Sequence, residues 1–303
     1  MAVTASMVKE LREKTGVGMM DCKKALAETG GDMEAAVDWL RKKGMASAQK
    51  KSARVAAEGK VTTLSLGSVG VMLEVNAETD FTAKNDNFCT FADTATKLAA
   101  DNGCTDIDTL KALDYPGTGR NVGDELTNLI ATIGENMNLR RIERMEVSSG
   151  LVSSYIHAGG KIGVLVALES TASADALQEL GKKLAMHVAA AAPQFLNRDS
   201  VDSEAMEREK SVLIDQARAS GKPDNIIEKM IVGRMDKYYA DVCLLEQAYV
   251  IDPDHKVQQV VDAAAKELGC PVKVTGYARF QLGEGIEKKE EDFAAEVAKV
   301  VQG

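Results

Sequence analysis

Few residues of this sequence stand in spacings that could do chemistry. A loop that holds nucleotide phosphates reads GxxxxGK[ST] or GxGxxG between a strand and a helix, and neither pattern occurs. The three histidines, His157, His187 and His255, are far apart and lack a Cys or Asp partner at metal-ligand spacing. We therefore expect no catalytic residue, no metal ligand and no cofactor.

Two histidines still need an interpretation. His187 lies three and seven residues from Leu184 and Leu180, within an apolar helical stripe, which favours a hydrogen-bonded core histidine. His157 could form an acid–base set with Glu78 and Asp80. Carboxylates are common in loops, so the hydrolase that this set would imply is a weak alternative.

Phe81 and Met20 are large apolar residues in polar surroundings. Phe81 stands in the loop NAETDFTAKNDN, where it could fold back onto the next helix as a hydrophobic staple or project as an anchor. Composition favours the staple. At 100° per residue Met19, Cys22, Ala25 and Leu26 share one helix face, and Met20 points nearly opposite. An exposed Met often marks a contact surface, although a single one is also ordinary.

Composition limits the function classes. The 303 residues exceed one compact domain, and no apolar run is long enough for a membrane span or a secretory signal, so we expect a cytoplasmic protein. The five cysteines lack CxxC spacing and are expected to be reduced and mostly buried. A net charge of −9 argues against a nucleic-acid-binding protein. Residues 1–56 differ, with 11 Lys or Arg against 7 Asp or Glu.

Helical periodicity predicts a three-helix bundle over the first 43 residues. Thr4 can cap its first helix and Asp32 its third. Residues 45–58 contain good helix formers without an apolar stripe, which is typical of a linker. Residues 1–56 are therefore expected to be a small tethered module.

An internal repeat follows. GKVTTLSLGSVGVMLEVN from Gly59 resembles GLVSSYIHAGGKIGVLVALE from Gly150, and the outgoing strand of each alternates as a strand with one buried face does. A helix with 3.6-residue periodicity follows each repeat, and the apolar stripe of the first helix includes Phe88 and Phe91. The fold class is therefore α+β, with two related subdomains expected at 57–143 and at 144–198 plus 241–282.

The rest of the chain is mainly helical. Residues 199–240 read as two charged helices joined by SGKP, which predicts an antiparallel hairpin. A further helix and the strand PVKVTGYARF return to the second subdomain. Residues 283–303 are expected to form a carboxy-terminal module with an amphipathic helix over residues 290–301.

Several motifs resemble the elongation factor Ts family. TGVGMMDCKKAL at residues 15–26 looks like the family signature, and NAETDF at 76–81 looks like its TDF motif. Other segments agree in order, namely IGENMNLRR, YIHAGGKIGVLV, HVAAAAPQFL, GKPDNIIEKMIVGRMDKYY, LLEQAYV and GEGIEKKEEDFAAEV. The resemblance covers nearly the whole chain. The stretch near 117–124 is less familiar, and Thr82 stands where the family usually has an aliphatic residue.

The resemblance implies a nucleotide exchange factor and not an enzyme. The family has a ubiquitin-associated-like (UBA-like) amino-terminal bundle, two core subdomains, a coiled-coil hairpin and a carboxy-terminal helix module. It binds the GDP form of elongation factor Tu and promotes GDP release during translation elongation by disturbing the Mg²⁺ site. The chain would bind no nucleotide and no membrane itself, and could form a homodimer through the coiled coil or the core.

Carried over residue by residue, the resemblance also implies contact positions. Asp80 and Phe81, with Thr79 beside them, would press between helices of the GTPase domain. Ile133 and His157 would add core contacts, and the last helix would clasp the partner. The amino-terminal module would contact the base-binding side of the GTPase through Arg12, Met19 and Met20. The alternative is a UBA-like adaptor without exchange activity.

Overall fold

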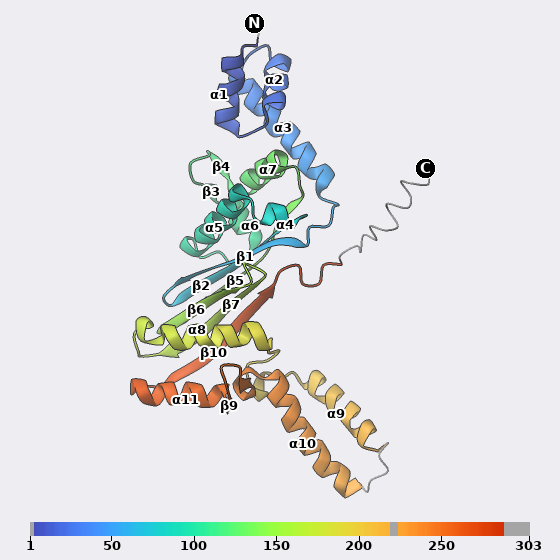
Figure 1. The fold of residues 1–303 in the computed structure, drawn as a ribbon, viewed down its shortest axis with the longest axis vertical. Helices are drawn as coiled ribbons and strands as arrows, with labels where there is room; N and C mark the ends of the chain where they lie inside the picture. Colours follow the sequence, from blue (N-terminus) through green and yellow to red (C-terminus); the bar gives the residue numbers. More distant parts are fainter. Residues whose placement is uncertain (1–2, 219–223, 288–303) are drawn as a thin grey trace. The chain divides into compact units, whose positions relative to one another are not determined.

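The structure is a computed structural model that describes residues 3–218 and 224–287. The chain divides into two compact units, and Figure 1 shows its elements in chain order. The first unit comprises residues 1–62, 73–142 and 281–303, and the second comprises 63–72 and 143–280. The result is a mixed α+β fold in which amino-terminal helices precede several small antiparallel sheets with helices, as expected.

The amino-terminal helices are α1 (Ala5–Thr15), α2 (Met19–Glu28) and α3 (Met33–Lys51). Both predicted caps are confirmed. The Thr4 side chain accepts from the backbone N of Met7, and the Asp32 side chain accepts from that of Ala35. The third helix does not end near residue 43, because α3 continues through Lys51.

The remaining elements of the first unit form four helices, a three-stranded sheet and a two-stranded sheet. They are β1 (Glu58–Leu66), β2 (Val69–Ala77), α4 (Asp80–Ala83), α5 (Asp86–Asp101), α6 (Ile107–Ala112), β3 (Asp114–Tyr115), β4 (Arg120–Asn121), α7 (Val122–Ile133) and β5 (Met137–Glu146). The sheet order is β1-β2-β5, and β3 pairs with β4. Residues 63–72 of the β1–β2 hairpin and residues 143–146 of β5 count with the second unit. Phe88 and Phe91 of α5 are buried, as its periodicity predicted.

The second unit has its own sheet, of order β10-β7-β6. Its elements are β6 (Gly150–His157), β7 (Ile162–Ser170), α8 (Ala174–Ala191), η1 (Arg198–Ser200), α9 (Ser203–Arg218), α10 (Asp224–Val242), η2 (Leu244–Glu246), β8 (Ala248–Tyr249), β9 (Asp252–Lys256), α11 (Val257–Leu268) and β10 (Val272–Gln281). In its core, buried residues of β6, β7 and β10 pack with Leu177, Leu184 and Val188 of α8.

The two repeat segments begin with the same backbone geometry. Gly59 has φ +126° and Gly150 has φ +125°. A Cβ on either glycine would lie 2.1 Å from a carbonyl oxygen of the outgoing strand, that of Val75 or of Leu168. Only glycine fits both the dihedral angle and the space.

The outgoing strands are buried more completely than the alternation predicted. Every residue of β2 after Val69 is buried, and so are most of those in β7, so the expectation of one buried face is wrong. Each of these strands lies at the centre of a three-stranded sheet. In the second unit α8 packs on β6 and β7, while Val152 and Leu165 lie against Gly70.

In the region of the predicted hairpin, the described residues form two helices, α9 and α10, that pack against each other. Leu213 of α9 packs with Ile227, Ile231 and Met235 of α10, and Tyr238 lies against this cluster. The helix α10 ends at Val242, two residues beyond the predicted hairpin. The carboxy-terminal helix expected at residues 290–301 lies outside the described residues.

Candidate functional site

Phe81 lies in α4, a single helical turn directly after β2. Thr79 caps this turn, since its side chain accepts from the backbone N of Thr82 at 3.3 Å. The Phe81 side chain is 81% exposed, whereas Thr82 is buried. The staple prediction is therefore wrong for this residue: Thr82 faces the core of the unit, and Phe81 projects into solvent.

Four polar residues hold this turn, and we call them the loop clamp: Glu78, Thr79, Glu135 and Asn136. The Glu135 carboxylate accepts from the Thr79 backbone N at 3.0 Å and from the Thr79 hydroxyl at 2.7 Å. The backbone N of Asn136 donates to the Glu78 carboxylate at 2.5 Å. Glu135 and Asn136, which follow α7, thus bind Thr79 and Glu78, which follow β2.

Ile133 is brought to the same place by the loop clamp. It is the last residue of α7, which ends at Gly134 with φ +93°, a left-handed conformation that suits glycine. Glu135 follows at once and binds Thr79. Of the predicted contact residues, the structure therefore brings together Thr79, Asp80, Phe81 and Ile133.

Asp80 carries the only acidic side chain within the four residues of α4. Its carboxylate pairs with Lys84 Nζ at 2.7 Å, one helical turn later. Both side chains are largely exposed, so solvent screens the pair and it adds little to stability. The pair places a carboxylate and an ammonium beside the exposed aromatic ring.

The other predicted contacts of the first unit lie on α1 and α2. Arg12 is exposed near the end of α1, Met20 is 76% exposed and Met19 is 57% exposed. The sequence placed Met19 on the buried face with Cys22, Ala25 and Leu26. Those three are buried, but Met19 is the first residue of α2 and has no preceding turn to cover it.

His157 belongs to the second unit, where it ends β6. It pairs with Ile162 across the β6–β7 turn, and its side chain is exposed. Its Nδ1 lies 3.0 Å from the Tyr155 hydroxyl. Glu78 binds Asn136, Asp80 binds Lys84 and His157 binds Tyr155. These hydrogen bonds do not join the three residues into the acid–base set of the hydrolase alternative.

His187 is a satisfied core histidine, as predicted. It is buried, its Nε2 lies 2.9 Å from Gln247 Oε1, and its Nδ1 accepts from the backbone N of Val250 at 3.2 Å. Burial lowers the pKa of this imidazole, against the opposing effect of the Gln247 hydrogen bond. A neutral ring with its proton on Nε2 satisfies both neighbours.

The described part of the chain offers neither a metal centre nor a membrane span. No group of three or more His, Cys, Asp or Glu within residues 3–218 and 224–287 could hold a metal ion. No helix in the same part of the chain is both long and apolar enough to cross a membrane. The five cysteines are all free thiols, and Cys22, Cys104 and Cys243 are buried.

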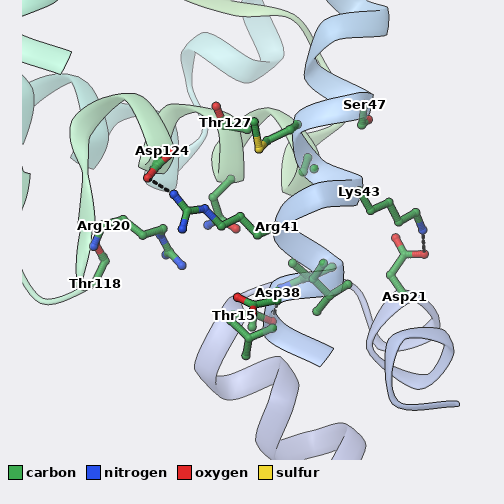
Figure 2. Close-up of a pocket in the computed structure, with 18 residues that line it drawn as sticks. Thr15, Asp21, Asp38, Arg41, Lys43, Ser47, Thr118, Arg120, Asp124 and Thr127 are labelled. Carbon is green, nitrogen blue, oxygen red and sulfur yellow. Dashed lines mark hydrogen bonds and ion pairs between the residues drawn. The ribbon is translucent and has the colours of Figure 1, made fainter. Parts of the chain in front are cut away.

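A cavity of about 250 Å³ lies in the first unit, lined by α2, α3, the β3–β4 turn and α7. Figure 2 shows its charged lining side chains, among them Arg41 paired with Asp124 at 2.6 Å and Lys43 paired with Asp21. Positive and negative groups alternate around it, so it offers no concentrated charge to a phosphate. None of the predicted contact residues lines it.

The start of the carboxy-terminal segment is held by a buried carboxylate. Glu74 of β2 accepts from Arg140 at 3.0 Å, from Arg141 at 2.6 Å and from the backbone N of Gly283 at 2.9 Å. Burial raises the pKa of this carboxyl, but hydrogen bonds from Gly283, Asn76 and the two arginines outweigh burial and lower it overall.

Comparisons with known proteins identify the family. A family model described as Elongation factor TS matches residues 78–284. Elongation factor Ts of Paramagnetospirillum magneticum is 60% identical over 98% of this chain and 96% of its own length. Elongation factor Ts of Syntrophotalea carbinolica is 56% identical over the whole of both chains. The chain belongs to the elongation factor Ts family.

Membership of the elongation factor Ts family gives the activity and explains the chemistry of the surface. The chain is a nucleotide exchange factor for elongation factor Tu and is not an enzyme. Such a factor needs binding energy that differs between two states of its partner and no nucleophile or general base. The elements that matter are therefore exposed contact side chains and the framework that fixes them.

Sequence reasoning did not predict a functional role for Glu135 and Asn136 of the loop clamp. Glu135 is 56 positions from Thr79, and Asn136 is 58 positions from Glu78. No local periodicity links residues so far apart. The family resemblance included both residues in the segment IGENMNLRR, but it gave neither of them a role.

Proposed function

We propose that the Phe81 turn acts as a wedge that opens the nucleotide site of elongation factor Tu. The observation that carries this proposal is the 81% exposure of Phe81 on a turn held by the loop clamp. Phe81 would press between helices of the GTPase domain near the Mg²⁺ and phosphate site. Asp80 would lie beside it as an anion that weakens Mg²⁺ coordination.

The wedge works only if its contacts favour the nucleotide-released state. An exchange factor and the nucleotide weaken each other's binding by the same factor, because allosteric coupling is reciprocal. Burying a Phe side chain of at least ~150 Å² at about 25 cal/mol/Å² contributes a few kcal/mol. That energy can offset part of the cost of moving a partner helix away from the Mg²⁺ site.

Further contacts would extend from the wedge. Ile133 lies beside the loop clamp and would add apolar contact with the GTPase domain. His157 would reach another domain of the partner. Met20, helped by Met19 and Arg12, would touch the base-binding side of the GTPase. In this proposal the chain binds no nucleotide itself and acts in the cytoplasm, where translation elongation takes place.

The finer architecture is also part of the proposal. Residues 1–56 would be a UBA-like module with its linker, and 57–143 and 144–198 plus 241–282 would be related core subdomains. The matching geometry of Gly59 and Gly150 supports the relation between the subdomains. Residues 199–240 would be a coiled-coil hairpin, and 283–303 would be the carboxy-terminal module.

The hairpin would support self-association and not exchange. Val232 is 65% exposed on α10, and Val212 and Ile226 are also exposed. Replacing residues 203–235 with a Gly/Ser linker keeps Asp236 and Tyr239, which hold Arg198 at the hairpin base. We expect GDP release to stay within about twofold of wild type, while sedimentation shows weaker self-association. Loss of all exchange would place the hairpin in the exchange contact.

The wedge is tested by stopped-flow release of labelled GDP from elongation factor Tu. Phe81→Ala should reduce the accelerated release rate at least ~10-fold, because it removes a buried aromatic anchor from the interface. Its melting temperature should hardly change, since the Phe81 side chain is 81% exposed and so contributes little packing to the described part of the chain. Ile251→Ala, which truncates another exposed apolar side chain, is the matched control and should release GDP normally. Wild-type release by Phe81→Ala would refute the wedge.

A further inference from the structure

We propose that Glu135 and Asn136 are positioning residues that hold the Phe81 turn in its active geometry. This inference rests on the proposed wedge and adds a cause for its rigidity. Neither residue carries the exposed apolar surface that would make it a contact itself. Both act through the backbone and side chains of Glu78 and Thr79.

The turn cannot hold itself. Helix formation has a costly first turn, and a helix as short as the four residues of α4 is not stable on its own. An exposed Phe81 contributes no packing to keep the turn in place. The conformation therefore depends on the burial of Thr82 and on the polar bonds that enter at Thr79.

Glu135 supplies two of those bonds. Its two carboxylate oxygens take both donors of Thr79, the backbone N at 3.0 Å and the hydroxyl at 2.7 Å. Because the hydroxyl proton points to Glu135, a lone pair of Thr79 Oγ1 is directed to accept from the backbone N of Thr82 at 3.3 Å. The carboxylate thus orients the cap that begins α4.

Asn136 supplies the second support, which acts on Glu78, the residue before Thr79. Its backbone N donates to Glu78 at 2.5 Å, and its side-chain Nδ2 donates to the backbone O of Arg54 at 2.7 Å. The Arg54 guanidinium also reaches Glu78, at 3.4 Å. The end of β2 is thereby tied both to the chain after α7 and to the chain after α3.

The Phe81 turn binds the partner more tightly when the loop clamp already holds it in one conformation, since ordering a loop on binding costs free energy. Glu135→Ala should therefore lower GDP release from elongation factor Tu about 10-fold, although Glu135 itself makes no partner contact. Glu135→Gln keeps one acceptor oxygen for Thr79 and should fall between Ala and wild type. Glu125→Ala is the control, because it removes a partly buried carboxylate of α7 that pairs with Arg120 and not with Thr79, and it should release GDP normally.

The test compares the wild type, these three variants, Phe81→Ala and the double variant Phe81→Ala/Glu135→Ala, all in the full chain. Residues that act through one group give non-additive effects. Glu135→Ala should thus have less than a twofold further effect in the Phe81→Ala background. Amide hydrogen exchange of residues 79–83 should also accelerate in free Glu135→Ala and not in Glu125→Ala.

Each outcome decides one of the two claims. Unchanged release by Phe81→Ala would refute the wedge itself. If Phe81→Ala is slow but Glu135→Ala releases GDP normally, the positioning role is refuted and the wedge stands. A Glu135→Ala defect that multiplies in full with that of Phe81→Ala, or that accompanies general loss of amide protection across the first unit, would make Glu135 merely structural.

Discussion

The His157 side chain is oriented by its neighbour Tyr155. The Tyr155 hydroxyl, two residues earlier on the same strand, lies 3.0 Å from Nδ1, and the two rings are tilted by 39° with centroids 6.0 Å apart. When the hydroxyl donates to Nδ1, the neutral imidazole carries its proton on Nε2. An exposed donor of fixed direction then stands at the end of β6.

We predict that His157→Ala weakens the complex with elongation factor Tu moderately, by roughly 3- to 10-fold in Kd, the effect of losing about one hydrogen bond. Tyr155→Phe removes only the orienting hydroxyl and should cost less. Calorimetry at fixed salt measures both variants. Unchanged affinity of His157→Ala would make the residue part of the fold alone.

Phe81 and Phe88 show what a sequence can indicate about single residues. Phe88 shares a helical stripe with Phe91, and periodicity alone predicts its burial, which the structure confirms. Phe81 lies in a polar loop where no periodicity applies, so composition favoured the staple and was wrong. Its exposure is decided by Thr82, which takes the buried position, and by Glu135, which is distant in sequence.

At the scale of elements, Glu74 connects β2 with β5 and with the segment that follows β10. It lies on β2 and binds two arginines of β5 and the backbone of the segment after β10. Gly283 fits there because its φ is +70° and a Cβ would lie 2.4 Å from the backbone O of Ala57. This network fixes the backbone of Gly283 against β2 within the first unit.

We predict that Glu74→Gln lowers the free energy of unfolding at pH 7 by about 2–3 kcal/mol, through lost charged hydrogen bonds. Because the folded pKa of Glu74 is lowered, its contribution is present above its unfolded pKa and is lost as the pH falls through the folded pKa. Urea midpoints of variant and wild type should therefore converge below about pH 4. Asp101→Asn, at an exposed ion pair, is the control and should differ little at either pH. A gap that persists unchanged in acid would contradict the linkage.

Caps and helical stripes could be predicted at this scale because their signals are local. The caps at Thr4 and Asp32 and the apolar stripes of the hairpin follow from spacings of three or four residues. The repeat could be predicted because its two segments resemble each other directly in sequence. The Glu74 network and the loop clamp could not be predicted. Their partners lie 56 to 209 residues apart, so only the fold brings them together.

At the scale of the whole molecule, α3 is more than a linker. It continues through Lys51, and Gly44 packs so closely on α7 that a Cβ there would lie 3.4 Å from Ala131 Cβ. Arg41 pairs with Asp124, the third residue of α7, at 2.6 Å. Within the first unit, one helix thus connects the bundle that carries Met20 with the helix that ends at Ile133.

We predict that Met20→Asp weakens binding to elongation factor Tu at least ~10-fold, since two linked contacts gain avidity through effective concentration and the loss of one removes that gain. Met45→Asp, at a second exposed methionine of the first unit, is the matched control and should bind normally. Both variants should retain the melting temperature of wild type. Equal binding by the two variants would make Met20 an ordinary surface residue.

The central claim is that Phe81 delivers its binding energy only when the nucleotide site is open. The most direct test measures the Kd of wild type and Phe81→Ala for nucleotide-free and for GDP-bound elongation factor Tu. We expect Phe81→Ala to weaken the nucleotide-free complex at least ~10-fold more than the GDP-bound complex, because only such a difference can drive release. Equal weakening of both complexes would contradict the account, since a residue that binds both states alike cannot shift the equilibrium between them.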